Sequence, residues 1–325
     1  MQIQKIRRYV VFVGVFLFVN GVLLTHVHAQ APQKPTLAVS SVGEGAIIWL
    51  MNLEGEDVRP LLAIDANPLP LGLEWSPDGR RLAFHTEVRK NIDVYVVNAN
   101  GKNLKRLTED AAEDSRPSWH PSGKTIAFTT NRDGNFEIYT MTDGGQALKN
   151  VTNDAVKDTD PAWSPDGRRM AFTSKRGRTL GDIYVMHANG ENMRNLTKNR
   201  SANTHAAWSP DERKIAFISN RTGAANIYAM DVADGANQVP IACCRDPEWS
   251  PDGEKIAGAT FGGGSRIFIR DADGKGPQLE LPGVSNVSRA PAWFDPDFVT
   301  VFSVSPAEKQ ALTWGWLKKA ARNEQ

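Results

Sequence analysis

The stretch Trp163-Ser-Pro-Asp-Gly167 recurs along the chain, and its recurrence decides the fold. Four of six tryptophans at matching positions are followed by Ser-Pro-Asp. The six are separated by 44, 44, 45, 41 and 44 residues, and they are Trp75, Trp119, Trp163, Trp208, Trp249 and Trp293. Self-similarity at a fixed period of this length indicates a repeat architecture. The unit of this fold is therefore a repeat of about 44 residues.

Each repeat predicts four short β-strands. The first strand ends at the tryptophan, because the Pro and Gly that follow stop a strand and favour a tight turn. The second is an apolar stretch such as Lys124–Phe128, and the third alternates in polarity as in Glu137–Met141. A hairpin at glycine, such as Asp143-Gly144, leads into a fourth strand that ends in a pair such as Leu107-Thr108. Four antiparallel strands without a helical pattern are typical of a β-propeller blade, with the tryptophans packed between blades.

Six first strands predict an all-β, six-bladed propeller over residues 36–304. One blade has to combine both ends of the chain, which removes the exposed sheet edges of an open array. Two segments compete for its second strand, Thr36–Ser41 and Phe298–Val304. We favour Thr36–Ser41, because Leu-Ala-Val-Ser-Ser resembles Ile-Ala-Phe-Thr-Thr of a later repeat. In the remaining tail, residues 305–325, the capping box Ser305-Pro-Ala-Glu308 predicts a short helix.

Residues 1–29 have the pattern of a secretory signal peptide. Lys5, Arg7 and Arg8 precede an apolar run from Tyr9 to Leu24, and Val27-His-Ala29 offers a cleavage site. We therefore expect export to the periplasm or the medium. Cleavage changes the charge from 38 − 37 to 35 − 37, or −2, which gives no electrostatic case for nucleic acid. The apolar run is short for a membrane anchor, so no stable insertion is expected after cleavage.

The order Trp-Ser-Pro-Asp-Gly, Ile-Ala-Phe, Asp-Ile-Tyr-Val-Met and Asn-Leu-Thr resembles the TolB-type, or WD40-like (PD40), propeller repeat over residues 36–297. This resemblance implies a six-bladed propeller. It implies less about function, since such blades occur in periplasmic TolB and in prolyl-oligopeptidase-like and dipeptidyl-peptidase-like enzymes. TolB adds an α/β domain and the peptidases add an α/β-hydrolase domain. The residues on either side of the expected propeller are too few for either.

The mouth of the central channel is the expected place for a site, because loops on a rigid scaffold carry most binding residues. The positions three residues before the six tryptophans should lie there, and they hold Gly72, Arg116, Asp160, His205, Asp246 and Ala290. With two flanking arginines, the candidate binding residues are Arg116, Asp160, His205, Arg245, Asp246 and Arg289. The alternative is that these charges only satisfy one another and the ends of neighbouring strands.

Recurrence separates structural from functional candidates. Arginines recur at matching positions in three loops (Arg132, Arg176 and Arg221), which favours a structural role. His205 and the run Cys243–Asp246 do not recur, and the run lies in a connector that is shorter than the others. Cys243 and Cys244 are adjacent, so they are either a vicinal disulfide or two free thiols.

The sequence holds no Gly-x-Ser-x-Gly elbow, no His-Glu-x-x-His and no spaced cysteine pairs for zinc. We therefore expect no metal or cofactor. The predicted function is a monomeric, non-enzymatic binding propeller that engages a protein or peptide partner through the channel-mouth face. The alternatives are an extracellular enzyme acting on a sugar or peptide, with His205 and the channel acids as acid–base groups, or a regulatory partner of a separately encoded peptidase.

Overall fold

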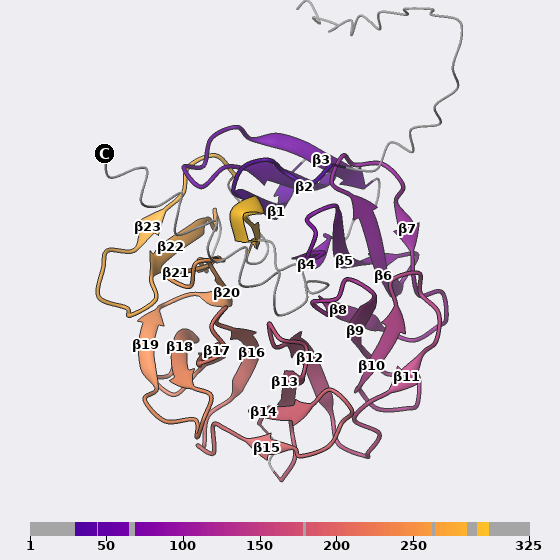
Figure 1. Cartoon of the computed structure of the whole chain (residues 1–325), viewed down its shortest axis with the longest axis vertical. Coiled ribbons are helices and arrows are strands. Elements are labelled where there is room, and N and C mark those ends of the chain that lie inside the picture. Colours follow the sequence, from indigo (N-terminus) through magenta and orange to yellow (C-terminus); the bar gives the residue numbers. More distant parts are fainter. Residues whose placement is uncertain are drawn as a thin grey trace, which may run out of the picture.

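The structure is a computed structural model that describes residues 30–43, 45–64, 69–177, 180–261, 264–284 and 291–298. Within these residues, 24 strands form six four-stranded antiparallel sheets, with one short 3₁₀ helix, η1 (Pro296–Phe298). The sheets are arranged radially around a central axis, with their first strands innermost (Figure 1). The predicted all-β, six-bladed propeller is confirmed.

Five blades run in chain order from the inner to the outer strand. The strands of the first two are β4 (Leu71–Trp75), β5 (Arg81–Val88), β6 (Asn91–Asn98), β7 (Lys105–Arg106), β8 (Asp114–Trp119), β9 (Thr125–Thr130), β10 (Glu137–Thr142) and β11 (Lys149–Asn150). Those of the next two are β12 (Asp158–Trp163), β13 (Arg169–Ser174), β14 (Asp182–His187), β15 (Arg194–Asn195), β16 (Asn203–Trp208), β17 (Lys214–Ser219), β18 (Asn226–Asp231) and β19 (Val239–Ala242). The fifth has β20 (Arg245–Trp249), β21 (Lys255–Ala259), β22 (Ile267–Asp271) and β23 (Leu279–Glu280).

The sixth blade joins both ends of the propeller, as expected. Its order is β24 (Ala292–Phe294), β1 (Thr36–Gly43), β2 (Gly45–Met51) and β3 (Arg59–Ile64). Leu37 of β1 pairs with Trp293 of β24, so Thr36–Ser41 takes the second-strand position that it was expected to take. The rival segment is described only as far as Phe298, which ends η1.

Two expected segments lie outside the described residues: the signal peptide at 1–29 and the helical tail at 305–325. Within the part of the chain that the structure describes, no helix combines the length and the apolar composition needed to cross a membrane.

The Ser-Pro-Asp-Gly turn is stabilised by its own side chains. The Ser76 hydroxyl donates to Asp78 at 2.6 Å and accepts the backbone N–H of Arg81 at 2.9 Å. Gly79 has φ +65°, and a Cβ there would lie 2.2 Å from the Phe294 ring in the closing blade. The same serine–aspartate bond recurs in the turns that begin at Ser164, Ser209 and Ser250. The turn therefore needs these residue types for local reasons.

The fourth strands are shorter than predicted, because at their end a threonine side chain takes the place of a backbone group in the hydrogen bond to the third strand. The backbone N–H of Ile183 donates to the Thr197 hydroxyl at 3.0 Å, and that hydroxyl donates to Asp182 at 2.8 Å. Thr108 and Thr152 accept the equivalent N–H groups in two other blades, also at 3.0 Å. The strands therefore end before the Leu-Thr or Val-Thr pair instead of including it.

The tryptophans pack between blades, as predicted. Trp208 belongs to an apolar cluster with Ile183 and Leu196 of the preceding blade. Its indole N–H donates to the carbonyl of Ala162 at 3.0 Å, and Trp249 makes the equivalent bond to Ala207 at 3.1 Å. At the centre of five of the blades lies a fully buried phenylalanine: Phe84, Phe128, Phe172, Phe217 and Phe268.

Candidate functional site

The innermost strand of each chain-order blade carries a β-bulge at the same place. The pairing register shifts there in β4, β8, β12, β16 and β20. The bulged residue has a φ between +50° and +57°, and in chain order the five are Gly72, Arg116, Asp160, His205 and Asp246. A bulge bends the strand and re-aims one side chain. The position three residues before each tryptophan is therefore turned by the backbone towards the channel.

The preceding blade holds three of these bulges in place. The backbone N–H of Arg116 donates to Nδ1 of His85 at 3.2 Å. The N–H of Asp160 donates to the Thr129 hydroxyl at 3.0 Å, and that of His205 donates to the Thr173 hydroxyl at 3.3 Å. Non-glycine residues in this conformation cost on the order of 1–3 kcal/mol each, so the neighbouring blade helps to maintain it.

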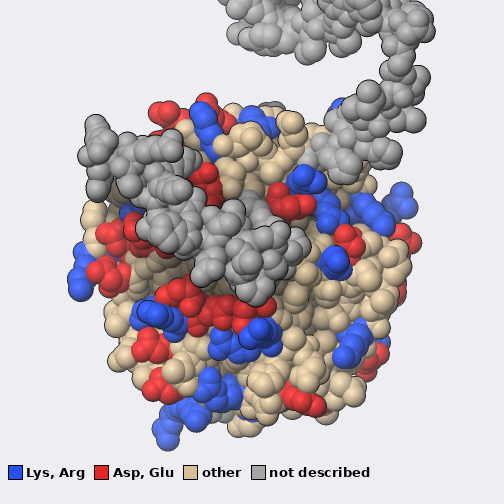
Figure 2. Space-filling model, in the orientation of Figure 1, with Lys and Arg blue, Asp and Glu red and all other residues tan. Residues whose placement is uncertain are grey.

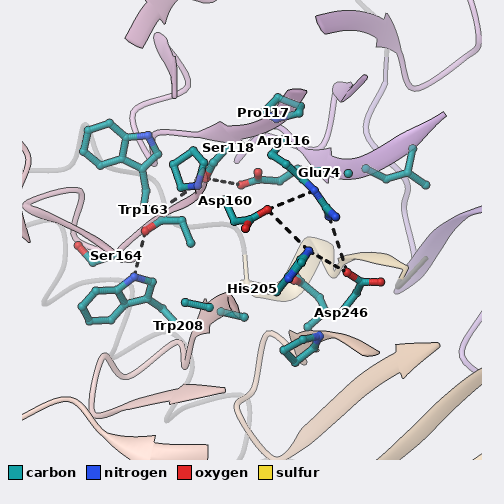
Figure 3. A pocket seen from close by; sticks show the side chains of 18 of the residues that line it. Glu74, Arg116, Pro117, Ser118, Asp160, Trp163, Ser164, His205, Trp208 and Asp246 are labelled. Carbon is teal, nitrogen blue, oxygen red and sulfur yellow. Dashed lines mark hydrogen bonds and ion pairs between the residues drawn. The ribbon is translucent and has the colours of Figure 1, made fainter. Parts of the chain in front are cut away.

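Four of the six predicted site residues meet at the channel and form what we call the charged ring: Arg116, Asp160, His205 and Asp246 (Figure 3). Arg116 lies 3.4 Å from Oδ1 of Asp160 and 3.7 Å from Oδ1 of Asp246. Nε2 of His205 lies 3.6 Å and 3.5 Å from the same two oxygens. Basic and acidic groups therefore alternate around the ring.

The charges of the ring are coupled. Burial alone would raise the pKa of Asp160, but His205 and Arg116 outweigh that effect and lower it to about 2. Asp160 is therefore ionised at neutral pH. The ring side chains remain between 9 and 22% exposed, so a ligand can reach them. Near the propeller axis, Figure 2 shows acidic side chains gathered on this face with basic side chains beside them.

The ring opens into a cavity of about 260 Å³ that runs along the inner strands. Its walls combine the polar groups with apolar side chains, which include Leu73, Pro117, Pro161, Trp163, Ala206, Ala207, Trp208, Pro247 and Pro291. A pocket in which apolar side chains stand beside converging polar groups is a candidate ligand site. Two of the repeat tryptophans, Trp163 and Trp208, thus have a second role as cavity walls.

Two glutamates in this cavity were not predicted, and both immediately precede a repeat tryptophan. Glu74 accepts the backbone N–H of Trp119 at 3.1 Å and the Ser118 hydroxyl at 3.4 Å. Burial, and then the charge of Glu248, raise the pKa of Glu74. Burial raises the pKa of Glu248 to about 8. Reading the column of residues before the tryptophans would have found both.

The other predicted site residues lie elsewhere. Arg245 is beside the cavity and not in its lining, with its guanidinium 5.6 Å from the ring centroid of half-exposed Phe261. Arg289 lies outside the described residues. Cys243 is exposed and Cys244 is buried, and both are free thiols.

The recurring loop arginines bind within their own blades. Arg132 lies 3.0 Å from Asp114, and Arg176 lies 2.8 Å from Asp158, while Arg221 donates to Asn203 at 3.4 Å. These contacts are structural, because each ties a loop to the start of the inner strand.

Three acidic groups near the second of these arginines are close enough to hold a metal ion: Glu137, Asp154 and Asp158. However, the guanidinium of Arg176 already contacts Asp154 and Asp158. Two of the three acidic groups therefore already pair with a cation of the chain itself.

Comparison with known proteins agrees with this architecture. No curated protein is significantly similar in sequence. TolB from Acinetobacter baumannii is 25% identical over 80% of this chain and 66% of its own length, with a TM-score of 0.71. A putative TolB from Agrobacterium tumefaciens is 20% identical over 81% of this chain and 99% of its own, with a TM-score of 0.64. Oligogalacturonate lyase from Vibrio parahaemolyticus shares the fold at 14% identity, 72% and 74% coverage and a TM-score of 0.51.

The family model of the TolB beta propeller domain, PD40, matches residues 39–156 and 148–314. These two matches cover most of the chain and all six repeat tryptophans. This chain matches 66% of the Acinetobacter protein, so about a third of that protein lies outside the match and its complete role does not follow from the likeness. The chain belongs to the TolB β-propeller (PD40) family.

Proposed function

We propose that this protein is an exported, non-enzymatic binding propeller that engages a protein or peptide partner at the charged ring and in the cavity below it. The observation that carries the proposal is the charged ring itself. Its four side chains come from four different blades, converge on one cavity and remain accessible from it.

The variation of this position among blades supports binding over a purely structural role. A position that only maintains the fold tends to keep one residue type, as the loop arginines Arg132, Arg176 and Arg221 do in three successive repeats. The bulge position instead takes glycine, arginine, aspartate, histidine and aspartate in an unchanged backbone conformation. The chemistry of its side chains is therefore not dictated by the bulge.

The size of the cavity limits what can enter it. About 260 Å³ is below the ~300–1,000 Å³ of sites for drug-sized ligands. One side chain or one chain end fits this volume better than a whole sugar chain or cofactor. Export is supported by the pattern of residues 1–29 and by the resemblance to periplasmic TolB.

The test is a comparison of two double variants with the same change in charge. Arg116→Ala with Asp246→Ala removes two ring residues, whereas Arg168→Ala with Asp273→Ala removes two exposed side chains that do not line the cavity. We expect a partner captured from envelope extract, then purified, to bind the ring variant at least about tenfold more weakly, since buried charged contacts contribute 1.5–3 kcal/mol. The control variant should bind like the native protein.

Equal affinity of the partner for the native protein and a folded ring variant would contradict the site assignment. Thermal unfolding of both variants has to accompany the measurement, because the ring also joins neighbouring blades. Capture of a peptidase as the partner would identify the protein as a regulatory subunit, which is one form of the same function.

A second candidate is acid–base catalysis on a sugar or peptide. The observation that favours it is Nε2 of His205 within 3.6 Å of two carboxylates in a cavity. A fold shared with an oligogalacturonate lyase is compatible with such chemistry, although fold does not imply function. Screening against polysaccharides and peptides separates the candidates, since an activity that disappears in His205→Ala would replace the binding proposal.

A further inference from the structure

We propose that the cavity below the charged ring receives a basic side chain of the partner, lysine or arginine, whose cation is bound by Glu74 and Glu248. This inference rests on the proposed function and specifies the chemistry of the segment that enters the channel.

The first argument is the charge balance of the cavity. Its described lining contains four carboxyl groups, one guanidinium and one imidazole. Within the charged ring, Asp160 and Asp246 share Arg116 and His205. Below the ring, the two glutamates have no cation of their own among the described residues. The cavity therefore has an excess of acidic groups at its lower level.

The second argument is the lack of a partner for one of these groups. The Glu248 side chain makes no hydrogen bond and no ion pair with the described residues, and burial alone raises its pKa. Glu248 is half-buried and lines the cavity, so its carboxyl group is available to a ligand there. Across the cavity, Glu74 is fixed by the Trp119 N–H and the Ser118 hydroxyl, so it is oriented before any ligand arrives. A cation between them would satisfy both carboxylates.

The walls favour an organic cation over a metal ion. Proline rings and indoles line the same cavity as the carboxyl groups, with Pro117, Pro161, Trp163, Trp208 and Pro247 among them. Such surfaces suit the aliphatic stem of lysine or arginine, and indoles attract a guanidinium. A divalent ion such as calcium needs six or more oxygen ligands. Besides the four carboxyl groups, the described lining adds only the hydroxyls of Ser118 and Ser164 as side-chain oxygens.

Cation binding should release a proton. Burial raises the pKa of Glu248 to about 8, so it is largely protonated at pH 7 and has to ionise when a cation pairs with it. The groups that face it from the other inner strands are Glu74, Arg116, Asp160 and His205, with Asp246 on its own strand. The charge of Glu248 raises the pKa of Glu74, so a cation bound between the two carboxyl groups favours the ionised form of both.

The probe is a pair of peptides, acetyl-Ala-Arg-Ala-amide and its citrulline analogue, which has nearly the same shape without the charge. We expect the native protein to bind the arginine peptide at least about tenfold more tightly, the discrimination of one buried charged contact. Titration calorimetry at pH 7 in two buffers of different ionisation enthalpy should show proton release for the arginine peptide alone. Affinity should rise from pH 6 to pH 8.

Glu248→Gln should abolish the preference and the proton release, and the matched control Glu254→Gln should retain both. Glu254 is an exposed residue of the same blade that does not line the cavity. Equal binding of the two peptides to the native protein would overturn the inference. So would an unchanged preference in folded Glu248→Gln, or saturable CaCl₂ binding that excludes the arginine peptide. If Glu248→Gln fails to fold, the inference is still tested in the native protein, by its preference between the two peptides and by the proton release on binding the arginine peptide.

The two proposals fail differently. If the partner binds Glu248→Gln as well as the native protein but not the charged-ring variant, the inference is wrong and the proposed function stands. If the arginine peptide is recognised but the ring variant retains its partner, the proposed function is wrong.

Discussion

Glu248→Gln should make the free energy of unfolding less sensitive to pH. In the unfolded chain a glutamate has a pKa of about 4.5, whereas burial raises the pKa of Glu248 in the folded protein to about 8. Between these values the folded state holds a proton that the unfolded state has lost. The free energy of unfolding therefore falls as pH rises through this range and is largest near its acidic end.

The magnitude follows from the two pKa values. From pH 5 to pH 7.5 the linkage amounts to about 3 kcal/mol, and contact of the carboxyl group with solvent in the cavity reduces the expected effect to about 2 kcal/mol. Glutamine cannot ionise, so the variant avoids this loss. Its removal of charge also relieves Glu74, whose pKa Glu248 raises, and this effect has the same sign.

The assay is urea unfolding of the native protein and Glu248→Gln, followed by tryptophan fluorescence and circular dichroism at pH 5, 6, 7 and 7.5. We expect the two to have similar stability at pH 5, with the variant more stable by about 2 kcal/mol at pH 7.5. Only the difference between the proteins is interpreted, because Asp158, with a pKa that burial raises to about 6, also titrates. A difference that stays constant across this range would refute the reasoning.

Two further predictions concern the scaffold. Burial lowers the pKa of His120, so the stability that this residue contributes is complete above pH 6.5 and is lost as pH falls. In urea unfolding, His120→Gln should therefore lose less of its free energy of unfolding on the acid side than the native protein does. The same pH dependence in both proteins would contradict this prediction. Gly235→Ala should lower the free energy of unfolding by at least about 1 kcal/mol more than Gly223→Ala. Both glycines have positive φ, but a Cβ at Gly235 would lie 2.1 Å from the Leu196 carbonyl and one at Gly223 meets nothing within 4 Å. Equal losses in thermal unfolding would show that close contact is not the cause.

The six blades could be predicted from the sequence because their signals are local. The tryptophan, the Ser-Pro-Asp-Gly turn and the glycine hairpin each act within a few residues, and the same local solution recurs. Closure required a choice between two apolar segments, and the pairing of Leu37 with Trp293 supports the one that resembled a repeat strand. The fourth strands end earlier in the structure than predicted. At Thr108 and its equivalents, the side-chain hydroxyl accepts the hydrogen bond from the neighbouring strand's N–H that a backbone carbonyl would accept in a continuing strand.

The site was predicted less completely, for physical reasons. The column of residues three before each tryptophan could be found by its mixed chemistry, and four of its members meet as expected. The bulge was not foreseen: aspartate and histidine adopt positive φ more often than most residues, but arginine does not, so the column shows no uniform signal for this conformation. Glu74 and Glu248 were missed because only the column three residues before each tryptophan was expected to line the channel, whereas the residues immediately before the tryptophans also reach the cavity.

The position of the variable residues explains how such a site can change without loss of the fold. At the bulge, the bonds that hold the backbone are donated by main-chain N–H groups of Arg116, Asp160 and His205 to side chains of the preceding blade. The identity of the bulged side chain is therefore not part of that restraint. Just before the tryptophan, interblade contact is made by Glu74 in one blade and by the Ala162 carbonyl in another. Two columns of channel-facing residues are thus free to vary blade by blade, and in this chain they supply all the charged groups of the cavity.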